Sequence, residues 1–533
     1  MGWRLPQGLW RHTTSSCHDI GLSSNIADHI APKSGNRRIS RRGTDGRDRA
    51  NTGTICRVNP SSMPVLVVDL DNTLLRSDIL HEMLLSAMSR NLATPAIAIS
   101  ALFKGKVAFK ERLQELSEFD VATLPYNDKV VEMVKGWRKS GGRTALATAS
   151  PQLVAERISD HLQMFDEVHG SIGSRNLKGA AKGQFLVERF GEKGFAYVGD
   201  SSVDLAVWQR SAHAITVTRS DRLHARAAAA APLATRLDRR GGLFRPMLRS
   251  LRPHQWLKNL LVFIPALAAH RFDVPTLLGS ALAFIGFCLI ASGSYIINDL
   301  LDIEADRQHI NKRSRPLASG ELPIAMGASL GGLALIAGLG ISAWFKPDLA
   351  ILLAFYFLLT TTYSLWLKRH AIIDIAVLSA LYSLRIFAGA VATSIAISVW
   401  LLAFSIFFFL SLAAVKRQAE LISRVEQGKL ELSTRGYRGG DIPLVGSMIV
   451  CSGMISSLVI VLYASSTSVR LLYRSPEWML GVAFILLYWI CRVAMITHRG
   501  QMHDDPVIFA ARDRTSYVLM VLVIGMLAIG ALF

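Results

Sequence analysis

Long runs of apolar residues dominate the second half of this chain, and they constrain its fold most strongly. Nine apolar segments span residues 257–270, 276–298, 322–344, 348–367, 371–393, 396–415, 442–466, 475–493 and 514–532. A helix needs about 20 such residues to cross the hydrocarbon layer of a membrane, and all but the short first segment are close to that length. We therefore predict an all-α membrane bundle of about nine transmembrane helices over residues 251–533.

Positive charge is unevenly distributed among the connections between these segments. The formal net charge is +19, but the lysines and arginines lie largely in loops rather than on one basic face, which argues against a nucleic-acid partner. With the amino-terminal side inside, the even-numbered connections hold fifteen Lys and Arg and the opposite connections hold four. We predict an integral protein of the bacterial inner membrane, with its preceding domain and active sites on the cytoplasmic side.

Two stretches in the first half of the chain, residues 1–62 and 218–250, have the composition of a tail and of a linker. Residues 1–62 hold ten Lys or Arg against four Asp and no apolar stretch of signal-peptide length, which predicts a disordered basic tail. A start codon assigned too far upstream of Met63 would also explain this tail. Residues 218–250 combine an Ala run with many Arg, which predicts a basic linker containing either an interfacial helix or a flexible tether.

The five cysteines show no paired spacing, so no disulfide framework is expected.

Polar and acidic residues follow three short strand-like runs within residues 63–217. The runs Val65–Val68, Thr144–Ala147 and Phe195–Val198 lead into Asp69 with Asp71, into Thr148, and into Asp200 with Asp204. Lys182 lies between the second and third runs. Because open parallel sheets carry their sites at the carboxyl ends of strands, the pattern predicts an α/β domain in which these side chains meet.

In this order, the four elements resemble the haloacid dehalogenase (HAD) superfamily, whose fold is a Rossmann-like parallel sheet. The resemblance implies a metal-binding nucleophile that forms an aspartyl-phosphate (Asp69), a general acid/base (Asp71), phosphoryl ligands (Thr148, Lys182) and further Mg²⁺ ligands (Asp200, Asp204). A carboxylate that attacks a phosphoryl group needs such cations to suppress the repulsion between like charges. Residues 77–142 are long enough for a helical cap over the site. The alternative is a degenerate domain retained for docking.

An acidic motif closes the second apolar segment of the bundle. Asp299, Asp302 and Asp306 are spaced i, i+3, i+7, so an uninterrupted helix places all three on one face, and Asn298 precedes them. Carboxylates at the end of a spanning helix are costly unless they have a function, and their hard oxygens suit Mg²⁺ held against a diphosphate. The basic residues Lys312, Arg313 and Arg315 follow closely and can neutralise phosphate oxygens. The alternative is a solvated, charged helix end.

Further charged residues lie in the same set of connections and mix both signs of charge. These candidate substrate-binding residues are Lys258, Asn259, Tyr363, Lys368, Lys416, Arg417, Glu420, Asp504 and Asp505. A polyanion that is coordinated partly through a metal requires both signs, whereas the positive-inside bias explains only the basic residues. His503 has no second His at helix spacing, so a zinc site is not expected.

These motifs resemble the UbiA prenyltransferase superfamily, and within it the decaprenyl-phosphate phosphoribosyltransferase branch. The resemblance covers residues 250–533 and consists of RPxQWxKN, NDxxDxxxD followed by KRxRPxASG, YSxxLKR, KRxxE and MHDDPVxFAxRD. One feature departs from ordinary members, because Lys416-Arg417-x-x-Glu420 stands where a second Asp-rich motif closes the sixth helix.

The resemblance implies a Mg²⁺-dependent membrane transferase. It would move 5-phosphoribosyl from phosphoribosyl pyrophosphate (PRPP) to a polyprenyl phosphate in the lipid bilayer and release pyrophosphate. The HAD domain would then remove the 5-phosphate of the product. One alternative is an aromatic-acceptor prenyltransferase that uses prenyl diphosphate, and the missing second acidic motif argues against it. A second alternative is a non-enzymatic lipid-binding or transport scaffold, for which charges at mid-membrane would be expected.

Overall fold

The computed structural model describes residues 63–533, apart from 91–93, 95–96, 98–99, 101–102, 104–105, 173–175, 238–241, 427–435, 468, 503–504 and 533. The predicted tail over residues 1–62 lies outside this described part, as does Asp504. Within it, an α/β region precedes a helical region, as the sequence predicts.

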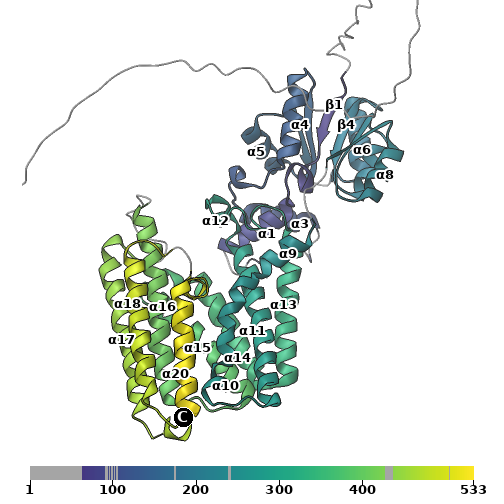
Figure 1. Ribbon diagram of the computed structural model, residues 1–533. Coiled ribbons are helices and arrows are strands. Elements are labelled where there is room, and N and C mark those ends of the chain that lie inside the picture. The colour runs from purple at the N-terminus through teal and green to yellow at the C-terminus, as the bar shows by residue number, and fades with distance from the viewer. Residues whose placement is uncertain are drawn as a thin grey trace, which may run out of the picture. The chain divides into compact units, whose positions relative to one another are not determined.

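The α/β region is built on one parallel sheet of six strands (Figure 1). The strands are β1 (Val65–Val68), β2 (Thr144–Pro151), β3 (Glu167–Ser171), β4 (Phe195–Gly199), β5 (His213–Val217) and β6 (Leu233–Leu237), in the order β3-β2-β1-β4-β5-β6. The flanking helices of the sheet are α4 (Asp128–Lys139), α5 (Gln152–Leu162), α6 (Ala180–Phe190), α7 (Leu205–Trp208) and α8 (Asp221–Ala230). Because β1 lies between β2 and β4, the loops that follow these three strands meet at one edge of the sheet.

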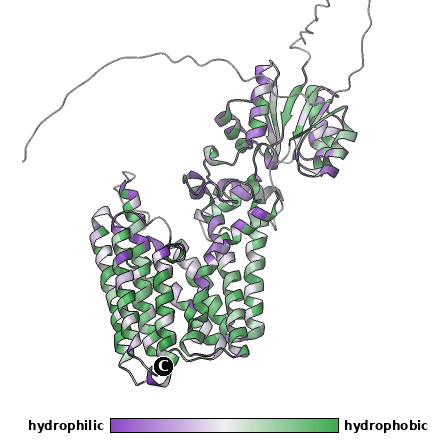
Figure 2. Ribbon diagram, viewed as in Figure 1, coloured by the Kyte–Doolittle hydropathy of each residue, from purple (hydrophilic) through white to green (hydrophobic). Residues whose placement is uncertain are grey.

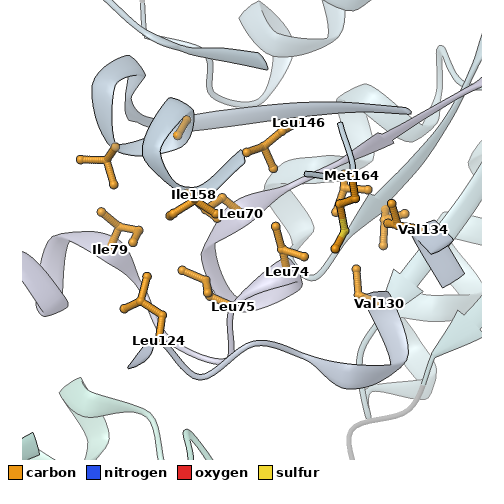
Figure 3. Packing of buried hydrophobic residues seen from close by; sticks show 14 of the residues in the cluster. Leu70, Leu74, Leu75, Ile79, Leu124, Val130, Val134, Leu146, Ile158 and Met164 are labelled. Atoms are coloured by element: carbon orange, nitrogen blue, oxygen red, sulfur yellow. The ribbon is translucent and has the colours of Figure 1, made fainter. Parts of the chain in front are cut away.

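The sheet is stabilised by apolar packing on both of its faces. Leu66, Val67 and Val68 of β1 are fully buried, as a parallel strand covered on both sides requires. Leu66 and Val68 belong to one apolar cluster and Val67 belongs to another, since successive side chains of a strand point to opposite faces. Figure 3 shows the first cluster, in which Leu70 and Leu74 pack close to residues from α4 and α5. This packing holds the loop after β1 in place.

The predicted helical cap is confirmed as a helical insertion but is shorter than residues 77–142. Helices α1 (Ile79–Arg90) and α3 (Lys106–Leu116) lie between β1 and β2. Helix α4 occupies the end of the predicted range, but Val130 and Val134 of α4 are buried in the core under the sheet. The helix is amphipathic and covers the sheet, so it belongs to the core of the domain.

The predicted boundary of the α/β domain at residue 217 is wrong. Helix α8 and strand β6 follow it, and β6 pairs with β5 from His213↔Leu233 to Val217↔Leu237. The Ala run, which its composition assigns to a linker, forms α8, whose Ala227 is fully buried against the sheet. Alanine has the highest helix propensity, and its small side chain allows this close packing. The linker therefore begins only after β6, and it ends in the helix α9 (Phe244–Leu251).

The helical region contains eight helices that are long and apolar enough to cross a membrane, counted over the described residues. They are α11 (Val274–Leu301), α13 (Ile324–Phe345), α14 (Pro347–Leu365), α15 (Ile373–Thr393), α16 (Val399–Glu426), α17 (Ile442–Ala464), α18 (Trp478–His498) and α20 (Arg514–Leu532). Figure 2 shows that hydrophobic residues extend along these helices. Their outward-facing apolar side chains, such as Phe484 at 73% exposure, suit a hydrocarbon environment.

The first apolar segment does not form one spanning α-helix. It begins as a 3₁₀ helix, η5 (Pro253–Phe263), and continues as the short α10 (Ile264–Ala268). Pro265 lies in the first turn of α10, where its missing N–H needs no partner, so the chain restarts its helix there. Of the nine predicted segments, this is the one that is too short for a full span.

Candidate active sites

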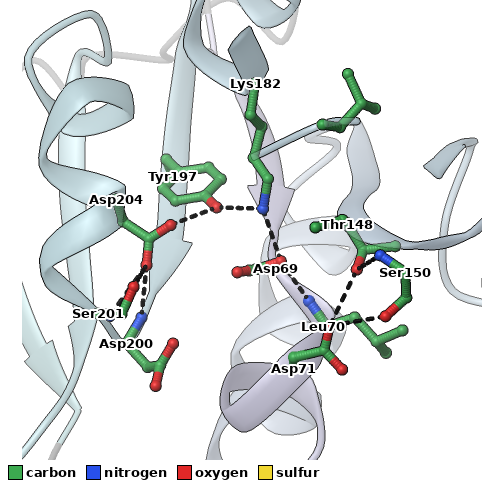
Figure 4. A network of polar contacts seen from close by, with 12 residues as sticks. Asp69, Leu70, Asp71, Thr148, Ser150, Lys182, Tyr197, Asp200, Ser201 and Asp204 are labelled. Atoms are coloured by element: carbon green, nitrogen blue, oxygen red, sulfur yellow. Dashed lines mark hydrogen bonds and ion pairs between the residues drawn. The ribbon is translucent and has the colours of Figure 1, made fainter. Parts of the chain in front are cut away.

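Asp69 and Lys182 form the centre of the site in the α/β domain. Asp69 follows β1, and Lys182 lies in the first turn of α6 with only 3% of its surface exposed. The Lys182 Nζ donates to Asp69 Oδ1 over 2.8 Å and to the Tyr197 hydroxyl over 3.0 Å (Figure 4). Burial raises the pKa of Asp69 to about 7, although the nearby Lys182 ammonium lowers it. A buried ammonium beside a carboxylate is the arrangement that lets a carboxylate approach a phosphoryl group.

The carboxylates of Asp69, Asp200 and Asp204 lie together at this edge of the sheet. One oxygen from each lies within 4.8 Å of the others, and this is the one group of potential metal ligands found among the described residues. Asp204 Oδ2 accepts from the Asp200 and Ser201 backbone N–H groups, and Asp204 Oδ1 accepts from the Tyr197 hydroxyl over 3.1 Å. Asp204 thereby holds the loop after β4 in place. The three carboxylates supply only hard oxygen donors, a set that fits Mg²⁺.

Asp71 and Thr148 occupy the other side of Asp69. Asp71 Oδ1 accepts from the Ile79 N–H over 2.8 Å, and Asp71 Oδ2 accepts from the Ser150 hydroxyl over 2.8 Å. The fully buried Thr148 hydroxyl is 3.5 Å from Asp71 Oδ2 (Figure 4). Burial raises the pKa of Asp71, and the nearby Asp78 carboxylate raises it further. A raised pKa favours the protonated form that can give a proton to a leaving oxygen.

The second site lies where α11 ends in the membrane region. Asp299 and Asp306 are buried to 6% and 2% exposure, and one arginine, Arg315, bridges them. The Arg315 Nη1 lies 2.9 Å from Asp299 Oδ1. Arg252 donates to Asp299 Oδ2 over 2.7 Å, and Lys312 lies 3.6 Å from Asp306 Oδ1. Buried carboxylates thus alternate with cations, an arrangement that can hold both a divalent metal and phosphate oxygens.

The three aspartates of the motif differ in exposure and in partners, and their shared helix face stays a prediction. Helix α11 ends at Leu301, and Asp302 separates it from the short α12 (Ile303–Gln308). The side chain of Asp302 is 48% exposed and its Oδ2 lies 3.5 Å from Lys368 Nζ. The helix is interrupted only locally at Asp302, since the Asp302 N–H still donates to the Asn298 carbonyl and the Asp306 N–H to the Asp302 carbonyl. Asp299, Asp302 and Asp306 supply hard oxygen donors of the type that Mg²⁺ prefers, although among the described residues three carboxylates lie at ligand distance of one another only in the α/β site.

Lys258, Lys416 and Asp505 come together, although they are far apart in the sequence. The Lys258 Nζ lies 2.6 Å from Asp505 Oδ2, and the Lys416 Nζ lies 3.7 Å from the same oxygen. Asn259 is fully buried beside them, and its Oδ1 accepts from the Arg385 Nε over 2.9 Å. The structure thus unites three of the predicted motifs around one carboxylate.

The predicted role of Arg417 as a substrate ligand needs correction. Arg417 is 1% exposed, and its Nη2 lies 2.6 Å from Asp374 Oδ2 at the start of α15. It also pairs with Glu420, one turn further along α16. The Asp374 carboxylate is fully buried and also accepts from the Tyr437 hydroxyl over 2.6 Å. Arg417 therefore joins α16 to α15, and Lys416 is the residue of this motif that faces the cluster around Asp505.

Loss of the Arg417–Asp374 pair is expected to destabilise the bundle. Because Arg417→Met leaves a buried Asp374 carboxylate without its cation, the free energy of unfolding should fall by about 3–5 kcal/mol. Thermal unfolding of the purified protein in detergent measures this. Arg499→Met is the matched control, since Arg499 is exposed at the end of α18. An unchanged melting temperature in Arg417→Met would contradict the structural role.

The remaining predicted residues lie near the second site without direct participation in its ion pairs. Asn298 and Tyr363 are half-buried in α11 and α14, and Arg313 is exposed in the connection after α12. The structure also brings four residues into these sites beyond the sequence-based candidates: Tyr197, Ser150, Arg252 and Arg385. Arg252 is the first residue of the RPxQWxKN motif, so the sequence carries a signal for it. The others follow only from which side chains meet in space.

Comparison with known proteins agrees with both halves of the architecture. The model of haloacid dehalogenase-like hydrolases matches residues 66–209, and that of the UbiA prenyltransferase family matches residues 259–429. The chain is 36% identical over 461 residues to uncharacterized protein y4nM of Sinorhizobium fredii. The matched region covers 86% of this chain and 89% of that protein. It is 36% identical over 294 residues to nodulation protein NoeC of Azorhizobium caulinodans, covering 54% and 93% of the two chains.

An integral membrane enzyme with a hydrolase-like domain is therefore the class that this architecture defines. The chain belongs to the UbiA prenyltransferase family and carries a haloacid dehalogenase-like domain before its membrane region. Over 219 residues it is 39% identical to decaprenyl-phosphate phosphoribosyltransferase of Mycolicibacterium smegmatis, covering 39% of this chain and 69% of that enzyme.

Proposed function

We propose that the membrane domain transfers 5-phosphoribosyl from PRPP to a polyprenyl phosphate with release of pyrophosphate. The observation that carries the proposal is the charge composition of the second site. Three aspartates are surrounded by four cations, Arg252, Lys312, Arg315 and Lys368, which suits a substrate rich in phosphate oxygens. The likeness to decaprenyl-phosphate phosphoribosyltransferase supports the same donor.

The residues around Asp299 would bind the diphosphate of the donor and stabilise it as it leaves. Arg315 and Arg252 are guanidinium groups whose paired N–H donors match phosphate oxygens. A bond forms between a phosphate oxygen of the acceptor and the anomeric carbon of the donor, and the bond from that carbon to the diphosphate breaks. The electron pair of the broken bond leaves with pyrophosphate, whose developing charge the cations offset.

Mg²⁺ bound by Asp299, Asp302 and Asp306 would supply Lewis-acid stabilisation of the diphosphate. Arg315 would then exchange its carboxylate contacts for phosphate oxygens, which would leave Asp299 and Asp306 to hold the metal. The side chain of Asp302 is 48% exposed and lies 3.5 Å from Lys368 Nζ, so it is less constrained than the two buried aspartates.

We further propose that the HAD domain removes the 5-phosphate from the lipid product. Asp69 would attack the phosphorus, so that an aspartyl-phosphate bond forms while the bond from phosphorus to the sugar oxygen breaks. Asp71 would give its proton to that oxygen, and water would then hydrolyse the aspartyl-phosphate. Lys182 and Thr148 would hold the phosphoryl oxygens. Two sites on one chain raise the effective concentration of the intermediate, roughly to the mM range for a short linker.

An isotope-transfer assay tests the proposed donor. Membranes containing the protein are incubated with ribose-labelled PRPP and a polyprenyl phosphate, or with labelled prenyl diphosphate and 4-hydroxybenzoate. We expect label in the lipid fraction only with the first pair, because Lys416 and Arg417 of α16 are basic where an aromatic prenyltransferase would carry a second acidic motif. Label in the aromatic product alone would instead establish an aromatic prenyltransferase. Absence of product from both pairs would leave the scaffold alternative.

A further inference from the structure

Arg385 lies deep in the bundle in a position that the proposed donor site does not use. It is the thirteenth residue of α15, about 18 Å along the helix axis from Ile373 at 1.5 Å per residue. Its residue exposure is 4%. A charged side chain at such a depth is costly unless a specific interaction compensates it, so its contacts indicate its role.

The Arg385 guanidinium contacts neutral groups. Its Nε donates to Asn259 Oδ1 over 2.9 Å, its Nη2 donates to the Tyr356 hydroxyl over 3.3 Å, and its Nη1 donates to the Leu381 carbonyl within the same helix. The rings of Tyr356 and Tyr382 lie 5.4 and 5.5 Å from its central carbon. Within the described part of the chain, no carboxylate forms an ion pair with Arg385. These contacts orient the guanidinium but do not neutralise it.

The neighbouring charges leave an excess of positive charge in the same cluster. Tyr382 connects them, because its ring also lies 5.6 Å from the Lys258 Nζ and its hydroxyl is 3.2 Å from Asp505 Oδ1. Lys258 and Lys416 share the single carboxylate of Asp505. Among the described residues, three cations are thus set against one carboxylate. A phosphate monoester carries a charge of about −1.5 to −2 near neutral pH, which matches this excess.

We propose that Arg385, Lys258 and Lys416 bind the phosphate monoester head of the lipid acceptor. This assignment rests on the proposed transfer reaction. It places the acceptor phosphate and the donor diphosphate at different groups of residues. The donor diphosphate has its own cations at Asp299 and Asp306. An anionic phosphate would compensate the buried charge of Arg385, and the hydrocarbon chain attached to it would suit the apolar surroundings of α15. Asn259 and Tyr356 are positioning residues, since they hold the guanidinium with its remaining N–H groups available.

The same chemistry is found in the 5-phosphate of PRPP, so the test must separate the two sources. Binding of polyprenyl phosphate and of Mg²⁺–PRPP is measured separately, each without the other substrate, on protein in lipid nanodiscs. We expect Arg385→Met to weaken polyprenyl phosphate binding about tenfold or more, because a hydrogen bond to a charged group is lost. Binding of Mg²⁺–PRPP should stay within twofold, and Arg385→Lys should recover part of the lipid affinity.

Two further variants keep the test decisive if Arg385→Met does not fold. Lys416→Met affects a partly exposed side chain of the same cluster and should also weaken lipid binding selectively. Arg492→Met is the control, since Arg492 is a membrane-helix arginine that already pairs with Asp513 at 2.7 Å, and its loss should leave both affinities unchanged. Polyprenol, which lacks the phosphate, should bind the parental protein and Arg385→Met equally.

Each outcome decides the assignment. If both Arg385→Met and Lys416→Met bind polyprenyl phosphate with the parental affinity, the acceptor-site assignment is overturned. If the variants lose only PRPP binding, the three cations bind the 5-phosphate of the donor instead. If the variants lose lipid phosphate binding but the parental protein transfers nothing from PRPP, the acceptor site stands and the proposed donor fails. If transfer from PRPP occurs and the variants retain the parental KM for lipid, the acceptor site fails alone.

Discussion

Replacing Asp299, Asp302 and Asp306 together with asparagine is expected to reduce transfer from PRPP roughly a thousandfold or more, because the charge on the leaving pyrophosphate loses its metal-mediated stabilisation. Asparagine preserves the size of each side chain. It removes the three charges that hold Arg252, Lys312, Arg315 and Lys368. Transfer is measured with ribose-labelled PRPP in membranes containing equal amounts of inserted protein.

The control for this variant is Asp348→Asn, because Asp348 is an exposed carboxylate in the first turn of α14. It should retain parental activity. The parental protein should also lose transfer in EDTA and recover it when Mg²⁺ is added. Normal turnover by the triple variant, or by the parental protein in EDTA, would exclude the metal-dependent transfer.

A loss of phosphatase activity is the expected result of a substitution in the HAD domain. Asp69→Asn should lower phosphatase activity by roughly a thousandfold, because an amide cannot form the aspartyl-phosphate and binds Mg²⁺ more weakly. The lipid product of the transferase should then accumulate with its 5-phosphate in place. Mass spectrometry of extracted lipids measures the ratio of phosphorylated to dephosphorylated product, and hydrolysis of p-nitrophenyl phosphate reports the site independently.

Asp160→Asn provides the matched control, since Asp160 is exposed on α5 and takes no part in the site. It should leave both measurements unchanged. If Asp69→Asn stops hydrolysis of p-nitrophenyl phosphate but dephosphorylated lipid still forms at the parental rate, the domain is active on another substrate. If the parental protein itself hydrolyses neither substrate, the alternative of a docking domain applies.

Much of the α/β site was accessible from the sequence because each motif follows its own strand. Short strand-like runs predict β1, β2 and β4, and parallel pairing then brings Asp69, Thr148 and Asp200 to one edge. The contacts made by Tyr197 were not accessible in this way. Its hydroxyl lies between Lys182 and Asp204, and a tyrosine within a buried strand gives no local signal of that role.

In the membrane region, too, local features can be predicted from the sequence, whereas contacts between distant residues cannot. Apolar run length alone predicts the eight long helices, since the bilayer sets the length of a spanning helix. The break at Asp302 was missed, because i, i+3, i+7 spacing is compatible with both a continuous and an interrupted helix. The ion pair of Arg417 cannot be predicted in this way, because its partner Asp374 lies on another helix and is distant in the chain.

Local features of the sequence predict the two-domain architecture, the membrane character of the second domain and the residue types present at both sites. These properties depend on local composition, strand and helix periodicity, and short motifs. Tertiary structure decided which charges neutralise one another and which remain for a ligand. Arg417 is paired and Arg385 is surrounded by neutral groups, although both are single arginines in apolar helices. Charge compensation acts across a few ångströms of space, and one chain position carries no information about its neighbours from other helices.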